Sequence, residues 1–366
     1  MKNRFASTTL TAGFPSRELI LLNGVWSALE KSHMIEKPNI EDEKIIIALN
    51  ENFSIQVGDV EFLPIGNDAS AFSYRVNTKD QKSYFLKIRK EISNRAGLFV
   101  PRFLKDNRIK QVIAPLSTKT QELWANVDGF AFILYPFITG NEAMKVGMTD
   151  AHWTEFGATL KRIHTTELTG RTLQYVMQES FTPRWSGLAK TLHEQVNTRE
   201  YDDPYQKQLA IFWKENNEKI QTLIERAEIL GKRLQRTNLE FVLCHADIHT
   251  ANILINQEQD MFIVDWDDIL FAPKERDLMF VLGENTVETR EEQLFFKGYG
   301  RMEINPLALA YYRYEWCIQE VGDFGERVFL KKDIGEITKK DSVEGFMKLF
   351  SRGDVVETAF NTSVEV

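Results

Sequence analysis

Hydrophobic and polar positions divide the chain into a strand-rich part followed by a helix-rich part. In the first part, short apolar runs alternate with turn residues, as in half-buried strands. The runs VEFLPIG, AFSYRV and SYFLKI lie at 60–66, 71–76 and 83–88, and further runs lie at 111–116, 122–127 and 130–138. Together they predict a five-stranded sheet. One helix is expected around 101–106, because proline is tolerated in a first helical turn.

Helical periodicity dominates after residue 140. In residues 149–164, Trp153, Phe156, Leu160 and Ile163 recur at steps of three and four, which indicates an amphipathic helix. Thr149 or Asp150 can cap the start of this helix. A second amphipathic stretch covers 205–234, FVLCH at 241–245 forms a strand, and the chain is mostly helical again from residue 277.

The pattern before the sheet predicts one more helix. Residues 34–53 resemble a capped amphipathic helix, with Ile45, Ile46, Ile47 and Leu49 on its buried side. This helix makes a natural domain start, so residues 1–33 are expected to be an extension. We therefore predict an α+β fold of two lobes, with a sheet lobe at 34–138 and a mainly helical lobe at 139–366.

The composition indicates which partners and which cellular compartment to expect. The 366 residues include 43% hydrophobic and 11% aromatic residues, enough for a large core, and the net charge is −8. Without a long block of Lys and Arg, nucleic acid is not an expected partner. Cys244 and Cys317 sit in apolar surroundings, and no apolar run approaches the ~20 residues of a membrane helix. These features favour a cytoplasmic protein that does not enter membranes.

One short segment concentrates polar side chains between apolar runs. In LCHADIHTANILI at 243–255, His245, Asp247 and Asn252 have the spacing H-x-D-x-x-x-x-N, and Asp265 follows in MFIVDWDD. The runs NILIN and MFIVDW flank the turn QEQD and predict a hairpin. Such a hairpin brings Asn252 and Asp265 to neighbouring strand ends.

This set matches the needs of phosphoryl transfer from ATP. Asp247 can accept or orient the proton of an attacking hydroxyl, whereas Asn252 and Asp265 offer hard oxygen ligands to Mg²⁺. His245 is expected to hold the loop through backbone hydrogen bonds. Taken singly, Asp and Asn are also ordinary turn residues. The order, the spacing and the flanking strands together favour the catalytic interpretation.

The passages CHADIHTANILI, IVDWDD and APKERDLMF resemble the aminoglycoside phosphotransferase family, and within it the spectinomycin phosphotransferases most closely. The likeness extends over about residues 34–360 and includes SYFLKI, IKQVIAP, YPFI and YYRYE. It implies a protein-kinase-like fold in which a D-x-D triplet, here 265–267, begins with the metal aspartate. Asp323 in the tripeptide DFG is rejected as that ligand, since it lies beyond a helical stretch.

The sheet lobe contains candidate nucleotide contacts. The loop 66–71, with Asn67, Asp68 and Ser70, can direct N–H groups and the Ser70 hydroxyl at phosphates, although it equally suits a plain hairpin. Lys87 lies in a strand and by spacing alone could face solvent. The resemblance implies that it pairs with the α- and β-phosphates. The linker backbone from Tyr135 to Phe137 is expected to bind an adenine edge.

The sequence departs from the family pattern at the partner of this lysine. The resemblance implies a glutamate on the next helix, but alignment places Arg95 in that position. Three outcomes stay open: Glu91 substitutes, Lys87 is oriented differently, or catalysis is weakened.

Candidate substrate contacts lie in the helical lobe. A cationic acceptor would favour carboxylates, and Asp268, Glu315, Glu320 and Asp323 are available. The aromatic residues Tyr311, Tyr312, Tyr314 and Trp316 could form a cation–π wall. Asp277 is expected to be a helix N-cap, and the resemblance implies that it also braces the catalytic loop.

The sequence thus predicts an ATP- and Mg²⁺-dependent phosphotransferase acting on a hydroxyl of a small molecule. The resemblance implies a cationic aminocyclitol or aminoglycoside antibiotic such as spectinomycin, inactivated by phosphorylation. A metabolic kinase for choline, a sugar or an amino alcohol would use the same motif. A nucleotide-binding pseudokinase is the alternative of another class. A monomer is favoured.

Overall fold

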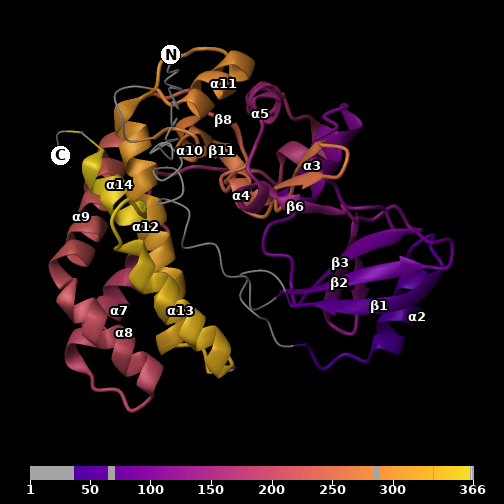
Figure 1. The fold of residues 1–366 in the computed structure, drawn as a ribbon, viewed down its shortest axis with the longest axis horizontal. Coiled ribbons are helices and arrows are strands. Elements are labelled where there is room, and N and C mark those ends of the chain that lie inside the picture. Colours follow the sequence, from indigo (N-terminus) through magenta and orange to yellow (C-terminus); the bar gives the residue numbers. More distant parts are fainter. Residues whose placement is uncertain (1–36, 65–70, 284–287, 333, 363, 365–366) are drawn as a thin grey trace, which may run out of the picture.

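The computed structural model describes residues 37–64, 71–283, 288–332, 334–362 and 364. A smaller lobe carries a five-stranded antiparallel sheet, and a larger lobe is built mainly of helices (Figure 1). The predicted α+β fold with two lobes is therefore confirmed. The lobe boundary at 138/139 stays a prediction.

The sheet of the smaller lobe positions Lys87. Its strands are β1 (Val57–Leu63), β2 (Ala71–Thr78), β3 (Ser83–Arg89), β4 (Ala125–Val127) and β5 (Phe130–Pro136), in the order β1-β2-β3-β5-β4. Leu86 and Ile88 of β3 are fully buried in a core that includes α2 (Asp42–Asn52). Because side chains alternate along a strand, Lys87 and Arg89 share the opposite face.

Three predictions for this lobe were wrong in detail. The run at 111–116 is not a strand of the sheet, and Val112 forms an isolated bridge with Ile263 instead. Helix α3 (Ala96–Asp106) begins earlier than predicted, because the Asn94 side chain accepts the Ala96 N–H, so Pro101 lies inside the helix. Ile47 is 51% exposed, because residues 45, 48 and 49 face the core and 47 lies on the other side of the helix.

The larger lobe follows a short linker. It starts with β6 (Gly140–Glu142), α4 (Ala143–Val146), α5 (Asp150–His164), α6 (Gly170–Leu173), β7 (Met177–Gln178), α7 (Ser186–Thr198), α8 (Pro204–Glu215) and α9 (Asn217–Leu234). Next come β8 (Val242–Cys244), the 3-10 turn η2 (Thr250–Asn252), β9 (Ile253–Asn256), β10 (Met261–Ile263) and β11 (Leu270–Ala272). The last helices are α10 (Glu275–Leu278), α11 (Arg290–Tyr299), α12 (Pro306–Phe329), α13 (Glu336–Leu349) and α14 (Val355–Asn361).

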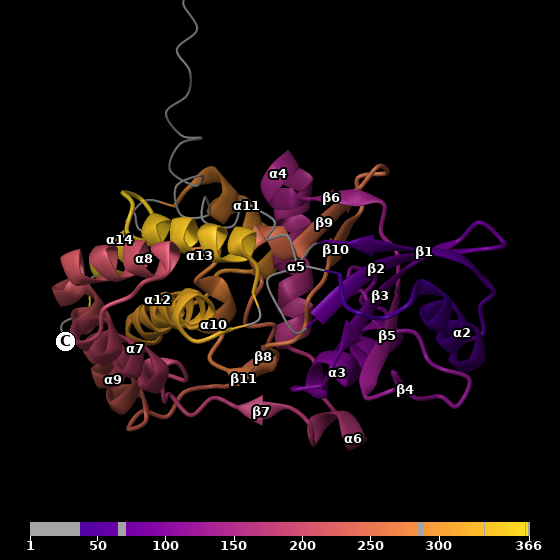
Figure 2. The same cartoon turned by 90° about the horizontal axis from the view of Figure 1, so that it is seen from below.

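Helix α12 forms the centre of the larger lobe. It packs against α7, α9, α13 and α14, and Figure 2 shows these helices around it. The amphipathic stretch predicted at 205–234 is two helices, which meet at Asn216. The helix predicted at 149–164 is α5, and its cap is Thr149, whose side chain accepts the His152 N–H. The predicted hairpin is also present as β9 and β10.

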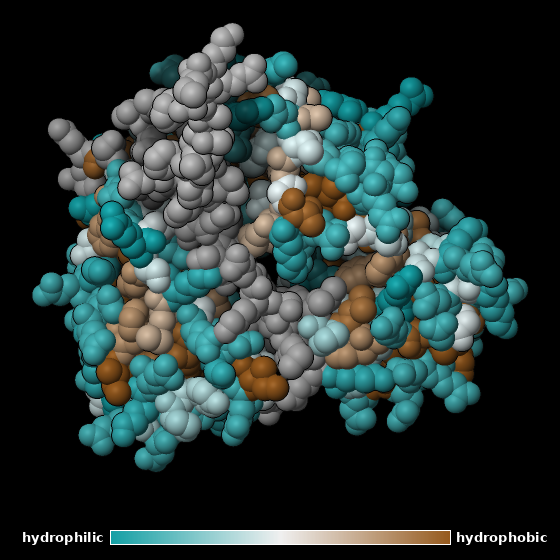
Figure 3. Space-filling view, viewed as in Figure 1, coloured by the Kyte–Doolittle hydropathy of each residue, from teal (hydrophilic) through white to brown (hydrophobic). Residues whose placement is uncertain are grey.

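Hydrophilic residues dominate the part of the surface that the structure describes in one view of the molecule. Most of the face shown in Figure 3 is hydrophilic, with small apolar patches between polar regions. Among the described residues, no helix combines the length and the apolar character needed to cross a bilayer.

Candidate active site

The loop between β8 and η2 presents Asp247 at the junction of the two lobes. Ala246 has φ 71°, a left-handed conformation that a residue with a Cβ adopts only when its surroundings enforce it. The buried Asp277 carboxylate supplies this constraint. Its Oδ1 accepts the Ala246 N–H at 2.6 Å, and its Oδ2 accepts the His245 N–H at 2.9 Å.

Two further side chains fix the same loop. His245 Nε2 lies 3.0 Å from the Val264 carbonyl oxygen, and His245 Nδ1 lies 3.3 Å from the Asp247 nitrogen. His245 therefore holds the loop as expected. Asn252 Nδ2 donates to the Asp247 carbonyl at 2.8 Å and to Asp247 Oδ2 at 2.9 Å. The amide oxygen of Asn252 is thereby left to face other ligands.

The β9–β10 hairpin brings Asp265 to the same place. Ile253 pairs with Ile263, and beyond this pair the Val264 N–H donates to the Asn252 carbonyl at 3.0 Å. Asp265 follows directly, with φ 59° and a side chain that is 48% exposed. The structure thus brings together Asp247, Asn252 and Asp265, as the motif spacing predicted. Hard oxygen atoms of an amide and a carboxylate fit a magnesium ion.

Lys87 crosses from the sheet to this cluster. Its Nζ lies 2.7 Å from Asp267 Oδ2 and 3.2 Å from Asp265 Oδ1. Burial alone would lower the pKa of Lys87, but the two carboxylates outweigh it and raise this pKa. For Asp267, burial would raise the pKa, yet Lys87 and Arg89 hold it well below the usual value. The cluster therefore carries fixed charges of both signs.

His249 is a neighbour of Asp247 to which the sequence analysis assigned no role. Its Nε2 lies 3.5 Å from Asp247 Oδ2, and its Nδ1 accepts the Ala251 N–H at 3.2 Å. Burial would raise the pKa of Asp247, but His249 lowers it, so the carboxylate stays ionised. The imidazole sits within the motif HADIHTAN, two residues after the aspartate. This position, next to the proposed base in the sequence, was the signal that could have indicated a role for His249.

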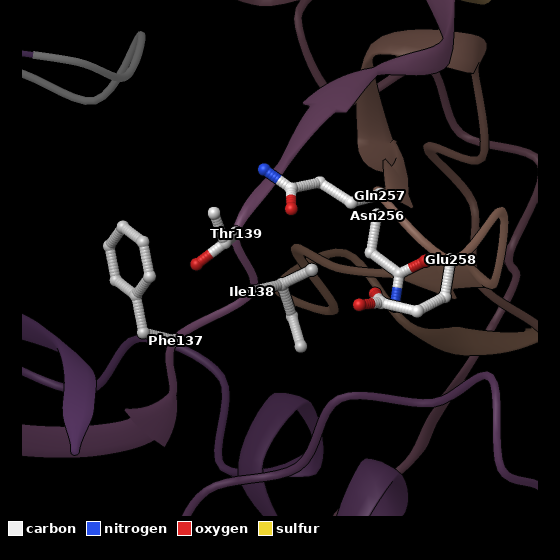
Figure 4. A pocket seen from close by; sticks show the side chains of 6 residues that line it. All are labelled: Phe137, Ile138, Thr139, Asn256, Gln257 and Glu258. Carbon is white, nitrogen blue, oxygen red and sulfur yellow. The ribbon is translucent and has the colours of Figure 1, made fainter.

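The predicted adenine contacts lie on the linker. Tyr135, the residue before the end of β5, lies beside Phe85, and the Phe137 N–H donates to the Ser83 carbonyl at 3.4 Å, so this N–H is directed at β3 rather than at a ligand. A cavity of about 390 Å³ lies between linker residues 137–139 and turn residues 256–258 (Figure 4). The phosphate-loop residues Asn67, Asp68 and Ser70 lie outside the described residues.

Three of the four predicted substrate carboxylates, Asp268, Glu315 and Glu320, differ in their surroundings. Arg276 lies 3.3 Å from Glu315, and both side chains are buried. Asp268 is 43% exposed and lies 3.9 Å from Arg184. Glu320 in α12 is partly buried, and burial, followed by the neighbouring Asp323, raises its pKa to about 8. Glu315 is thus already neutralised by an arginine, whereas the charge of Glu320 is the least compensated of the three.

Several other predictions for the helical lobe need correction. Asp277 is not an N-cap, because α10 begins at Glu275 and places Asp277 inside its only turn. Tyr311, Tyr312 and Tyr314 are at most 1% exposed and Trp316 is 9% exposed, so they belong to the core and form no open wall for a cation. Asp323 lies within α12 and pairs with Arg327. Its rejection as a metal ligand agrees with this position.

Comparison with known proteins identifies the family. The model of the phosphotransferase enzyme family (APH) matches residues 61–314, more than half of the chain. The chain belongs to this family. A member of the APH family is a phosphotransferase, as the catalytic motif predicted.

Solved structures agree with this assignment. Spectinomycin phosphotransferase APH(9)-Ia, in complex with ADP and spectinomycin, is 29% identical, with a TM-score of 0.80 over 89% of this chain and 99% of that one. Amicoumacin kinase hAmiN, 16% identical, has a TM-score of 0.55 over 85% of this chain and 93% of that one. Choline kinase LicA from Streptococcus pneumoniae, 17% identical, has a TM-score of 0.52 over 83% of this chain and 98% of that one. No curated protein sequence matches the APH chain described here.

Proposed function

We propose that this APH family member transfers the γ-phosphoryl group of ATP to a hydroxyl of a cationic aminocyclitol such as spectinomycin, which would inactivate the antibiotic. The observation that carries the proposal is the convergence of Asp247, Asn252 and Asp265 on one side of Lys87. Asn252 lies 2.9 Å from Asp247, and Lys87 lies 3.2 Å from Asp265.

Asp247 is the base in this reaction. Its lowered pKa keeps it ionised at neutral pH, so it can accept the proton of the acceptor hydroxyl as the oxygen attacks the γ-phosphorus. The bond between the γ-phosphorus and the bridging oxygen breaks, and its electron pair leaves with ADP. Asn252 holds the Asp247 carboxylate, and Asp277 holds the backbone of the two preceding residues, His245 and Ala246, so the base is oriented before the acceptor binds.

Positive charge must balance the phosphates. Lys87 provides one cation at the nucleotide side of the cleft, supported by its raised pKa. Asn252 and Asp265 would hold Mg²⁺, which when bound neutralises charge on the phosphate oxygens. The loop residues Asn67, Asp68 and Ser70 and the linker residues Tyr135 and Phe137 complete the proposed nucleotide site, apart from the Phe137 N–H, which donates to Ser83.

Solved structures of relatives support a nucleotide as the phosphoryl donor and an aminocyclitol as the acceptor. Spectinomycin phosphotransferase was solved with ADP and spectinomycin, and also with AMP, at 29% identity to this chain. Amicoumacin kinase was solved with AMP-PNP and Ca²⁺. Among the carboxylates available for the amines of the acceptor, Glu320 is favoured, with Asp268 and Glu315 as further members of that side of the cleft.

Mass spectrometry tests the proposed acceptor. The protein is incubated with ATP, Mg²⁺ and either spectinomycin, streptomycin or kanamycin. Spectinomycin is expected to gain the mass of one phosphoryl group. Choline, ethanolamine and simple sugars form the second arm, because a metabolic kinase with this fold would modify one of them instead.

The variant Asp247→Ala separates an enzyme from a pseudokinase. It should lose at least about 10³-fold in turnover, yet bind ATP with nearly unchanged affinity, because Asp247 faces the acceptor. Asp260→Asn, at the exposed hairpin turn, is the matched control and should behave as wild type. If the wild type and Asp247→Ala both bind ATP and neither modifies any acceptor, the chain is a nucleotide-binding pseudokinase.

A further inference from the structure

We propose that Asp267, the last residue of the triplet 265–267, orients Lys87 for the nucleotide in place of a glutamate on helix α3. This role rests on the phosphotransfer proposed above, and it answers the question raised by Arg95. The positioning carboxylate comes from the larger lobe, whereas the lysine comes from the sheet.

The contacts of Asp267 support this role. Its Oδ2 lies 2.7 Å from Lys87 Nζ and 2.9 Å from the Arg89 guanidinium. The two cations project from the same face of β3, and the side chains of Lys87 and Asp267 are only 16% and 28% exposed. Asp265 also contacts Lys87, but in the proposed reaction the Asp265 carboxylate binds the metal ion. Asp267 is then the carboxylate left to hold the lysine.

Helix α3 is shaped to let Asp267 approach. A Cβ on Gly97 would lie 2.8 Å from the Trp266 carbonyl oxygen and 3.2 Å from Asp267 Cα, so no side chain fits between the helix and the triplet. Asn94 Nδ2 donates to the Asp267 carbonyl at 2.9 Å. The start of α3 is thus docked on the backbone of the triplet, which fixes where the Asp267 carboxylate points.

The residues that could have played this role point elsewhere. Arg95 is exposed, and its guanidinium lies 5.7 Å from the Trp124 ring and 5.9 Å from the Tyr175 ring. Tyr175 stacks on Phe99 of α3 at 4.8 Å. Arg95 therefore joins a contact between α3 and the segment after α6, beside Trp124 and Tyr175. Glu91 lies on the surface before the helix.

Titration calorimetry with ATP and Mg²⁺ tests the assignment without needing the acceptor. Asp267→Asn should weaken ATP binding by about 10- to 100-fold, because a misplaced lysine loses its phosphate contact. Asp267→Glu should recover part of the affinity, since it restores the charge. Glu91→Gln is the matched control and should bind ATP as wild type does. A loss of affinity in Glu91→Gln with wild-type binding by Asp267→Asn would overturn the proposal in favour of Glu91.

A double-mutant cycle shows whether Asp267 acts through Lys87. In a Lys87→Ala background, Asp267→Asn should cost less than about threefold in ATP affinity, because the group that it orients is gone. A full, additive loss would mean a merely structural role and would overturn the proposal, and thermal unfolding of each variant separates folding defects from positioning. Failure of the wild type to bind ATP would remove the proposed function as well. Unchanged affinity in Asp267→Asn would remove only this assignment.

Discussion

Asp277 Oδ1 accepts the backbone N–H of Ala246 at 2.6 Å, and this bond joins a buried carboxylate to the residue just before the proposed base. Asp277 is fully buried, and His164 Nε2 lies 2.9 Å from its Oδ2. His164 in turn lies 2.6 Å from the Tyr299 hydroxyl. A chain of buried polar contacts from α5, α10 and α11 therefore determines the conformation of the catalytic loop.

Asp277→Asn should destabilise the protein and slow the reaction. An amide in this position turns an NH₂ group toward backbone N–H donors, which leaves a buried donor unsatisfied and costs about 2–3 kcal/mol. The loss of stability is measured as the free energy of unfolding in urea, and the slower reaction is measured as kcat for phosphorylation of the acceptor. Asp260→Asn, on the exposed turn, should change stability by less than about 0.5 kcal/mol. Equal stability of the two variants would contradict the bracing role.

Gly157→Ala should destabilise the packing of α5 against α11, the helix pair that carries His164 and Tyr299. A Cβ at this position would lie 2.0 Å from the Phe295 carbonyl oxygen, which belongs to backbone and cannot rotate away. The helices must separate, at a cost of about 3 kcal/mol. Gly187→Ala in α7 meets nothing within 4 Å and should be neutral or stabilising by up to about 0.5 kcal/mol. Denaturation midpoints compare the two, and a neutral Gly157→Ala would contradict the close approach.

The sequence predicted the local backbone structure around the candidate site where spacing and short-range structure determine it. The motif from His245 to Asn252 and the hairpin to Asp265 are local, so the neighbourhood of Asn252 and Asp265 followed from strand length and turn composition. The capped helix at 149–164 followed from its periodicity for the same reason.

What the sequence could not show depends on contacts between distant segments. Lys87 and Asp267 are 180 residues apart, and nothing in the pattern around either residue indicates that they meet. The burial of Tyr311, Tyr312 and Tyr314 likewise depends on which helices surround α12. Aromatic residues at helical spacing suit a core and an open wall equally well. The prediction of Asp277 as an N-cap was wrong because its side chain bonds to the distant catalytic loop and not to the start of its own helix.

Removal of the metal should abolish transfer, and Asp265→Asn should raise the requirement for it. The carboxylate supplies a charged oxygen ligand that the amide lacks, so half-maximal activity should need at least about tenfold more Mg²⁺. The measurement is a Mg²⁺ titration at constant ATP after treatment with EDTA. Asp260→Asn is again the control with the same change of group. An unchanged Mg²⁺ requirement in Asp265→Asn would contradict its assignment as a ligand.

Glu320 should make binding of a cationic acceptor depend on pH. Burial and the neighbouring Asp323 raise its pKa from 4.5 to about 8, so the free enzyme holds Glu320 neutral at pH 7 and ionises it as the pH rises through about 8. Only the ionised form attracts an ammonium group, and hence the KM of the acceptor should fall by roughly an order of magnitude between about pH 6.5 and 8.5. In Glu320→Gln this fall should be absent, whereas any titration of the acceptor itself persists in both proteins.

The same carboxyl also predicts a stability difference of known sign. Because the folded state holds the Glu320 proton more tightly than the unfolded chain does, this group lowers the stability of the wild type progressively as the pH rises from about 4.5 to about 8. Glu320→Gln removes that dependence, so its unfolding temperature relative to wild type should increase from pH 5 to pH 9. Glu303→Gln, on the exposed segment before α12, should show no such trend. Two results together would contradict this assignment: Glu320→Gln gains no stability relative to wild type at high pH, and its acceptor KM still falls as the pH rises. Another group would then bind the cation.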